Sequence, residues 1–460
     1  MRILIGLALI AAGCGGKSAP PKGPSGPAAI APDFAATRWV PAQPTYVFAL
    51  KSLHDLEGVA AGFASPDDVK AALGQATTMG IDVDGGVALF SEGLDPTLVV
   101  HLAAPDTTAK LLAGFASAPC VNGTCTRDVK FGTLTATIDH DWLWLHITHK
   151  GSTDTADWFA HSHAPSGATW ADDWHFATGL HEHASKLVGF VNAHAVLAKI
   201  AQRAEAAAAC TQLVAPVQRV GFAFDGDLQH LDARVSIDLG TAAGGVARAI
   251  VPPPAGWDKA FSAAPFVFED NVDFTAIAAW LQPCAALFGG DDLAELTGAG
   301  VRTARFGLLS ADPDNPLKAR GAVALDLTDR KTVGSLLDRI PMRKTFERDH
   351  DFGGLHGHRI SIPTQGTVDY VLDDHVALAA LGDGLLEQVV AGTAAPTSRL
   401  FAIDVRPAAM PADAWKSLLE QVGVHDADVI ATQLTRWQDA HAGVTLDHGA
   451  LVFEVAGNRK

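Results

Sequence analysis

Thr97-Leu-Val-Val-His-Leu-Ala103, followed by Asp106–Leu112 (DTTAKLL), is the stretch from which the fold is best predicted. The first segment is an apolar run with the length of a buried strand, and the second begins with Asp, a residue that caps helices. The same pattern of strand and then helix recurs at Ala319–Leu325 (ARGAVAL) and Asp329–Leu337 (DRKTVGSLL). Two widely separated parts of the chain therefore predict the same local structure.

The repeated order of elements extends outward from these segments. Tyr46–Leu50 (YVFAL) and Phe266–Phe268 open the two halves as apolar strands, and alternating strands are predicted later at Lys130–Ile138 and Leu355–Ile362. Hairpins outnumber single strand–helix–strand units, which favours antiparallel sheets. The predicted fold class is α+β, with two similar halves, each a largely antiparallel sheet with helices packed on one face.

The boundary between the halves is predicted at Val251–Gly256 (VPPPAG), because polyproline continues neither a helix nor a sheet. We therefore expect a first α+β repeat at 41–250 and a second at 260–460. The chain has 460 residues, of which 48% are hydrophobic and 18% charged. A chain of this length and composition is folded and is long enough for more than one core.

The N-terminus has the features of a processing signal. Met1-Arg2 is followed by the apolar run Ile3–Ala12 and then by Gly13-Cys14. The run is too short to span a bilayer and has the length of a signal-peptide core. Small residues before a cysteine resemble the lipobox of bacterial lipoproteins, although Ala11 stands where that motif usually has leucine. The resemblance implies that residues 1–13 are a lipoprotein signal peptide and that Cys14 is acylated.

Residues 14–40 are predicted to form a flexible Gly/Pro/Ala/Ser tether, since Gly15–Pro32 (GGKSAPPKGPSGPAAIAP) has no hydrophobic period. The formal net charge of −17 shows no basic footprint for nucleic acid. Anionic lipids repel an acidic protein, so we expect the acyl chains to attach it to the membrane. The predicted location is the cell envelope, lipid-anchored. Gly15, in place of an inner-membrane retention Asp, points to the outer membrane, facing the periplasm or the cell surface.

The order of elements resembles that of uncharacterised bacterial lipoproteins classed as domains of unknown function. The resemblance includes the opening phrase Pro41-Ala-Gln-Pro-Thr-Tyr-Val47 and covers most of the chain after the tether. It rests on apolar patterns and implies no assigned activity.

The cysteines predict two disulfide bonds. With Cys14 assigned to the anchor, four remain, which suits an oxidising compartment: Cys120, Cys125, Cys210 and Cys284. Asn122-Gly123 between the first two is a strong hairpin signal. Cys120 should then face Cys125 in a non-hydrogen-bonded pair, with Cα atoms about 4.5 Å apart. Cys210 and Cys284 remain for each other, and the alternative is buried free thiols.

Histidine pairs raise the question of a metal site. His161-Ser-His163 lies in a polar stretch without an evident third ligand, and His181-Glu-His183 lies in an expected helix, where residues two apart diverge. His356 and His358 share a strand face, but Ile360 continues that face as an apolar stripe. We therefore predict half-buried or surface histidines, with no metal and no cofactor.

The tryptophans fall into two groups. Trp142 and Trp144 alternate with leucines and are predicted to be core residues. Trp158, Trp170 and Trp174 belong to the insertion Lys150–Trp174, whose acidic sequence predicts a surface loop. We therefore take these three residues as a candidate binding surface.

The functional prediction follows from motifs that the sequence lacks. G-x-S-x-G, H-E-x-x-H and the dinucleotide fingerprint do not occur. The favoured function is a non-enzymatic binding or scaffolding role, with the membrane and either a protein or an apolar ligand as partners. One alternative is a periplasmic carrier of an apolar ligand, which a pocket above about 300 Å³ would favour. Another is a metal-dependent envelope enzyme, which needs three ligands about 2.0–2.2 Å from one point.

Overall fold

The computed structural model divides into two compact units, residues 1–208 with 217–238 and residues 209–216 with 239–460. The predictions for Cys14, Cys210, Cys284 and His181–His183 lie outside the residues that it describes. The described residues are 31, 33–56, 66–152, 158–163, 170–179, 185–201, 215–227, 229–273, 275–276, 300–312, 318–337, 343–362, 366–421 and 426–459.

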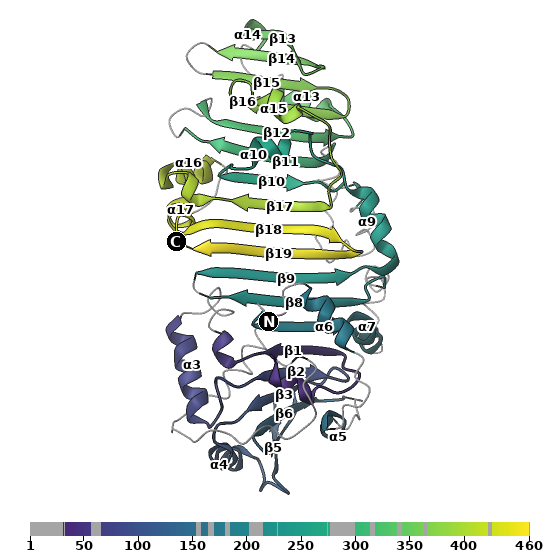
Figure 1. Ribbon diagram of the computed structural model, residues 1–460, viewed down its shortest axis with the longest axis vertical. Helices are drawn as coiled ribbons and strands as arrows, with labels where there is room; N and C mark the ends of the chain where they lie inside the picture. The colour runs from purple at the N-terminus through teal and green to yellow at the C-terminus, as the bar shows by residue number, and fades with distance from the viewer. Residues whose placement is uncertain are drawn as a thin grey trace. The chain divides into compact units, whose positions relative to one another are not determined.

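The first unit is an antiparallel sheet, drawn in Figure 1 from purple to teal. Neighbouring strands in the sheet occur in the order β4 (Thr124–Val129), β5 (Gly132–Asp139), β6 (Trp142–His149), β3 (Thr97–His101), β2 (Val87–Ser91), β1 (Tyr46–Leu50), β7 (Leu187–Asn192), β8 (Arg219–Gly226) and β9 (His230–Asp238). Its helices are η1 (Ala35–Trp39), η2 (Leu53–Asp55), α3 (Pro66–Thr78), α4 (Pro105–Phe115), α5 (Trp158–His163), α6 (Ala171–Thr178) and α7 (Ala193–Ala201).

The second unit is also an antiparallel sheet. Its neighbouring strands are β13 (Glu347–Phe352), β14 (Leu355–Ile362), β15 (Gly366–Leu372), β16 (Val376–Leu381), β12 (Arg320–Leu327), β11 (Val301–Ser310), β10 (Phe266–Asp270), β17 (Arg399–Val405), β18 (Trp437–Asp447) and β19 (Ala450–Arg459). Its helices are η4 (Gly240–Ala242), α9 (Ala243–Ala249), α10 (Trp257–Phe261), α13 (Lys331–Leu337), α14 (Arg343–Phe346), α15 (Leu385–Val390), η7 (Pro407–Ala409), α16 (Ala412–Gln421) and α17 (Ala427–Leu434).

Strand order is shared by the two units. In the first, β1 pairs with β2 and β7; in the second, β10 pairs with β11 and β17. Farther out, β3–β6 corresponds to β12–β16. At the outer end of this series, the second unit has one strand more than the first, β13, which pairs with β14. Counting back from β6 and β16, Leu355–Ile362 corresponds to β4, so its predicted match with Lys130–Ile138 is wrong by one strand.

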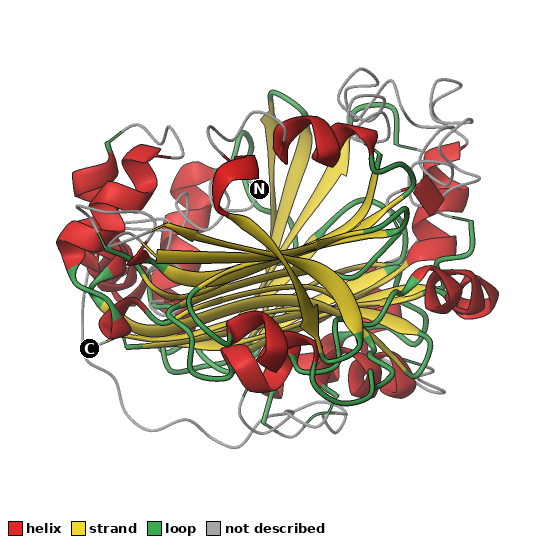
Figure 2. Ribbon diagram, turned by 90° about the horizontal axis from the view of Figure 1, so that it is seen from above, coloured by secondary structure: helices red, strands yellow, loops and turns green. Residues whose placement is uncertain are grey.

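Antiparallel sheets combined with helices confirm the α+β class, but the prediction that helices pack on one face is wrong. In the first unit, Trp142 and Trp144 pack in one core cluster with residues of η1 and α6. Leu143, between them, belongs to a second cluster with Ala76 of α3. Successive strand residues point to opposite faces, so an uninterrupted apolar strand needs cover on both sides. Helices on both sides of the strands are visible in Figure 2.

The second unit has the same two-sided core. Val267 belongs to a core cluster that includes Trp257 of α10 and Leu386 of α15, whereas the preceding residue, Phe266, packs against a second cluster that includes Trp415 of α16. As in the first unit, neighbouring residues of the central strand serve different faces. Among the described residues, no helix is long and apolar enough to cross a membrane.

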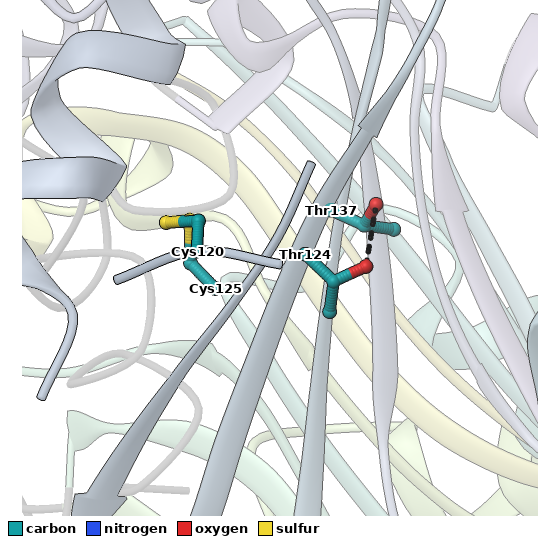
Figure 3. The surroundings of a disulfide bond; sticks show 4 residues. All are labelled: Cys120, Thr124, Cys125 and Thr137. Atoms are coloured by element: carbon teal, nitrogen blue, oxygen red, sulfur yellow. Dashed lines mark hydrogen bonds between the residues drawn. A yellow bond between two sulfur atoms is a disulfide. The ribbon is translucent and has the colours of Figure 1, made fainter. Parts of the chain in front are cut away.

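The predicted hairpin and its disulfide are confirmed (Figure 3). Asn122 and Gly123 have φ values of 50° and 80°, the positive values that a two-residue type I′ turn requires. Val121 and Thr124 exchange two backbone hydrogen bonds of 2.9 Å. Cys120 and Cys125 form the next pair outward, with a Cα–Cα distance of 4.3 Å. Local turn geometry is thus sufficient to bring the two sulfur atoms together.

Neither predicted aspartate is at the N-cap, and only Asp329 accepts a hydrogen bond from the first residue of its helix. The backbone N–H of Lys331 donates to Asp329 Oδ1 over 2.9 Å at the start of α13. By contrast, α4 begins at Pro105 with Ala104 at the N-cap, so Asp106 lies inside the first turn. Proline is favoured at the first helical position because its missing N–H would have no partner there. Pro105 therefore sets the helix start.

Candidate functional site

Trp170 and Trp174 are core residues, which contradicts their prediction as an exposed binding surface. Each is 1% exposed. Trp170 precedes α6 and Trp174 lies within it, and their rings pack on Phe190 and Phe34 with centroid distances of 5.9 and 5.0 Å. The acidic residues beside Trp174 occupy the more exposed side of this short helix. The prediction failed because helical periodicity separates neighbours that look alike in a polar stretch.

Trp158 is half-buried against the same core cluster, and its ring stacks on His146 with a centroid distance of 4.8 Å. The two rings line a cavity of about 20 Å³ together with Asp95 and Thr97. This volume is room for a single water molecule, so the cavity is not a ligand site. Trp142 and Trp144 are 2% and 0% exposed, as predicted.

The candidate histidine pair lies on β14. The rings of His356 and His358 are 5.9 Å apart, and His358 Nδ1 is 3.1 Å from Asp349 Oδ1. In the part of the chain that the structure describes, no three His, Cys, Asp or Glu side chains are arranged to hold a metal ion.

A stronger candidate site is found where the two units differ. In the first unit, Ala49 of β1 lies opposite Ala88 of β2. The corresponding pair in the second unit is Glu269 of β10 and Arg305 of β11. These charged residues are only 3% and 2% exposed. The second unit therefore has two charged residues at strand positions where the first unit has two alanines.

Arg305 connects three segments of the second unit. All five N–H bonds of its guanidinium donate to described acceptors. The acceptors are Asn271 Oδ1 for Nε (2.6 Å), Asp326 Oδ2 (2.9 Å) and Thr303 Oγ1 (3.2 Å) for Nη1, and the carbonyl oxygens of Val251 (2.8 Å) and Pro252 (3.3 Å) for Nη2. The side chain thus fixes the proline segment Pro252–Pro254 to the sheet and has no donor left over.

The network continues through Glu269. Arg399 Nη1 donates to Glu269 Oε1 over 3.2 Å, and Asn271 Nδ2 lies 3.3 Å from Glu269 Oε2. Asp270 follows on the opposite face, where burial raises its pKa to about 6. The Val272 N–H, 3.1 Å from Asp270 Oδ1, and the charge of Arg305 partly offset this increase. Ionisation of Asp270 therefore costs free energy in the folded protein.

Beside the network lies a groove of about 230 Å³. The proline segment borders it, and most of its other described lining residues are apolar, including Ala324 of β12, Val376 and Leu378 of β16, and Leu355 of β14. Arg305 and Asp326 are the two lining residues with polar side chains. We take this groove as the candidate site.

Sequence reasoning missed the groove because it depends on long-range pairing. One local signal was available: Glu269 interrupts the apolar strand Phe266-Val-Phe-Glu-Asp270, and Arg305 interrupts another. A buried charge needs a partner, so each of these residues predicts a polar or charged residue beside it. The sequence does not show which residue that partner is.

Comparisons with known proteins add little. No protein-family model and no curated protein matches the chain. A solved structure titled "Structure of crystal form IV of TP0453" is 10% identical, covering 46% of this chain and 84% of that chain with a TM-score of 0.28. Crystal form III of TP0453 is 11% identical, covering 45% and 80%, with a TM-score of 0.26. Similarity this low supports no conclusion about fold or function.

Proposed function

We propose that this protein is a lipid-anchored lipoprotein of the bacterial cell envelope, on the outer membrane, with a non-enzymatic binding role. The groove beside Pro252–Pro254 is the proposed binding site. The observation that carries the proposal is the joining of an apolar groove to a buried network that holds one of its walls. A wall fixed before the ligand arrives reduces the ordering cost of binding.

The envelope location rests on two features. The Cys120–Cys125 disulfide suits an oxidising compartment outside the cytoplasm. The lipobox-like segment ending at Cys14 and the Gly/Pro-rich segment after it supply an anchor and a spacer. The predicted end of the tether at residue 40 is wrong, because Phe34 is 0% exposed and Ala35–Trp39 form η1, which packs in the first core cluster. A Gly/Pro-rich spacer of this kind lets the folded units stand away from the lipid surface.

We also infer that the two units are copies of one ancestral α+β repeat. Their shared strand order around β1 and β10 supports this. In such a duplication, one copy can change while the other retains its core. The difference between the Ala49–Ala88 pair and the Glu269–Arg305 pair is of this kind.

The volume of the groove decides between binding modes. At about 230 Å³ it is smaller than the roughly 300–1,000 Å³ of sites that enclose a drug-sized ligand. Leu355, on its lining, is 41% exposed. The groove therefore suits a short apolar group presented from solution better than the enclosed cargo of a carrier.

Cys14→Ala should release the protein from the membrane. Without the thiol, no acyl chains are attached, and the acidic body has no other proposed hold on lipid. Labelling cells with radioactive palmitate should mark the wild-type protein and leave Cys14→Ala unmarked, with the variant in the soluble fraction. Ser18→Ala, in the tether, is the control and should behave as wild type. If Cys14→Ala were still labelled with palmitate and still sedimented with the membranes, Cys14 would not be the anchor.

Val376→Trp should abolish binding of a small apolar probe. Val376 is half-buried in the groove lining, and an indole there fills the space that the probe needs. Calorimetric titration with hexan-1-ol measures the effect, and we expect at least about a tenfold loss of affinity. Val429→Trp is the control, because Val429 is 55% exposed on α17. Absence of hexan-1-ol binding to the wild type would refute the binding proposal.

A further inference from the structure

The polar groups of the groove restrict the chemistry of its ligand. Arg305 is the one described lining residue with side-chain N–H donors, and all five are already used within the protein. The guanidinium therefore has no hydrogen bond to offer a carboxylate or phosphate. An arginine in a binding groove usually indicates an anionic ligand, but this one is occupied.

Asp326 has unused acceptor capacity. The bonds from Arg305 Nη1, at 2.9 Å, and from the Thr303 hydroxyl both end on its Oδ2. No described residue donates to Oδ1, and the side chain is 24% exposed. Pro252–Pro254, on the border of the groove, have no N–H donors, and the carbonyl oxygens of Pro252 and Pro254 already accept from Arg305 and from the Trp257 N–H. The side chains and prolines of the lining therefore offer no donor, and the open side-chain acceptor is Asp326 Oδ1.

We propose that the groove binds a short aliphatic chain that ends in a primary ammonium group. The ammonium donates to Asp326 Oδ1, and the chain packs against apolar residues such as Val376 and Leu378. This inference rests on the proposed function, since it names the ligand class of that same groove. A free alkylamine and a lysine side chain share this chemistry.

Energetics favour the ammonium over other end groups. Its hydrogen bond to a carboxylate is charge-assisted, roughly twice as strong as a neutral one. A neutral hydroxyl makes the weaker bond. An anionic end group places like charges beside each other and finds no free side-chain donor, which costs free energy.

The test compares probes of equal chain length on the full protein by calorimetry at pH 7.5. We expect hexylamine to bind about tenfold tighter than hexan-1-ol, and hexanoate to bind most weakly. Hexyltrimethylammonium, which keeps the charge but has no N–H, should bind at least about fivefold more weakly than hexylamine. Nα-acetyl-lysine N-methylamide is the lysine arm: binding comparable to hexylamine identifies a lysine side chain as the source, and weaker binding identifies a free amine.

Asp326→Asn should reduce hexylamine affinity to that of hexan-1-ol. Asp374→Asn is the matched control, because Asp374 is 77% exposed on the same unit, and it should leave the preference unchanged. The inference is overturned if hexanoate binds as well as hexylamine, or if folded Asp326→Asn keeps the preference. In either case, the proposed binding function would still be supported if hexan-1-ol bound saturably to the wild type and Val376→Trp abolished that binding. If Asp326→Asn fails to fold, the comparison of hexylamine with hexyltrimethylammonium on the wild-type protein tests the inference, and equal affinities would overturn it.

Discussion

Arg305→Ala should lower the free energy of unfolding of the second unit by about 3–5 kcal/mol. The substitution leaves Asp326 without its cationic partner and Asn271 without its donor, both in a region where Arg305 itself is 2% exposed. It also releases the carbonyl oxygens of Val251 and Pro252. Urea denaturation followed by circular dichroism measures the loss.

A matched surface pair separates burial from charge. Arg330 and Asp374 also form an ion pair, at 3.3 Å, but their side chains are 59% and 77% exposed. Arg330→Ala should therefore change the free energy of unfolding by no more than about 0.5 kcal/mol. In the double variant Arg305→Ala/Asp326→Ala, the loss should be smaller than the sum of the single losses, since the unpaired carboxylate is removed. A cost below about 1 kcal/mol for Arg305→Ala would contradict a buried network.

Trp174→Ala should destabilise the first unit by about 3–5 kcal/mol, the usual cost of replacing a buried large aromatic residue with alanine. Trp174 is 1% exposed and packs edge-on against Phe34. The same urea experiment measures the change. Phe131→Ala is the comparison, because Phe131 is 46% exposed and its loss should cost within about 0.5 kcal/mol. If both variants unfolded at the same urea concentration, the tryptophan would belong to a surface after all.

The parts of the fold that sequence predicts are those whose causes are local. Tyr46–Leu50 is a strand over the predicted residues, and the Asn122-Gly123 turn aligns Cys120 with Cys125. Each depends on a few consecutive residues. The second apolar face was overlooked, although Trp142-Leu143-Trp144 already has large apolar side chains on both sides of a strand.

The candidate site could not be predicted in this way. Glu269 and Arg305 are adjacent only because β10 and β11 pair in one register, across a long intervening segment. The carbonyl oxygens that Arg305 binds come from the proline segment, which in sequence indicated a boundary between halves. Contacts place these prolines within the second unit. The segment that the sequence predicts to be a boundary between the halves therefore lines the candidate site.

The five saturated donors of Arg305 also bear on how the second unit opens. A chain segment without regular secondary structure commonly frays at little cost, independently of the sheet beneath it. If Val251 and Pro252 separated from the sheet, the two N–H groups of Arg305 Nη2 would lose their acceptors. Leaving a buried donor without an acceptor costs more free energy when the donor is charged than when it is neutral. Local opening of the proline segment is therefore coupled to loss of the whole network. The amide of Val251, which donates to the carbonyl oxygen of Asn271 over 2.7 Å, should therefore exchange its hydrogen only on global unfolding, and the groove keeps its shape for as long as the unit remains folded.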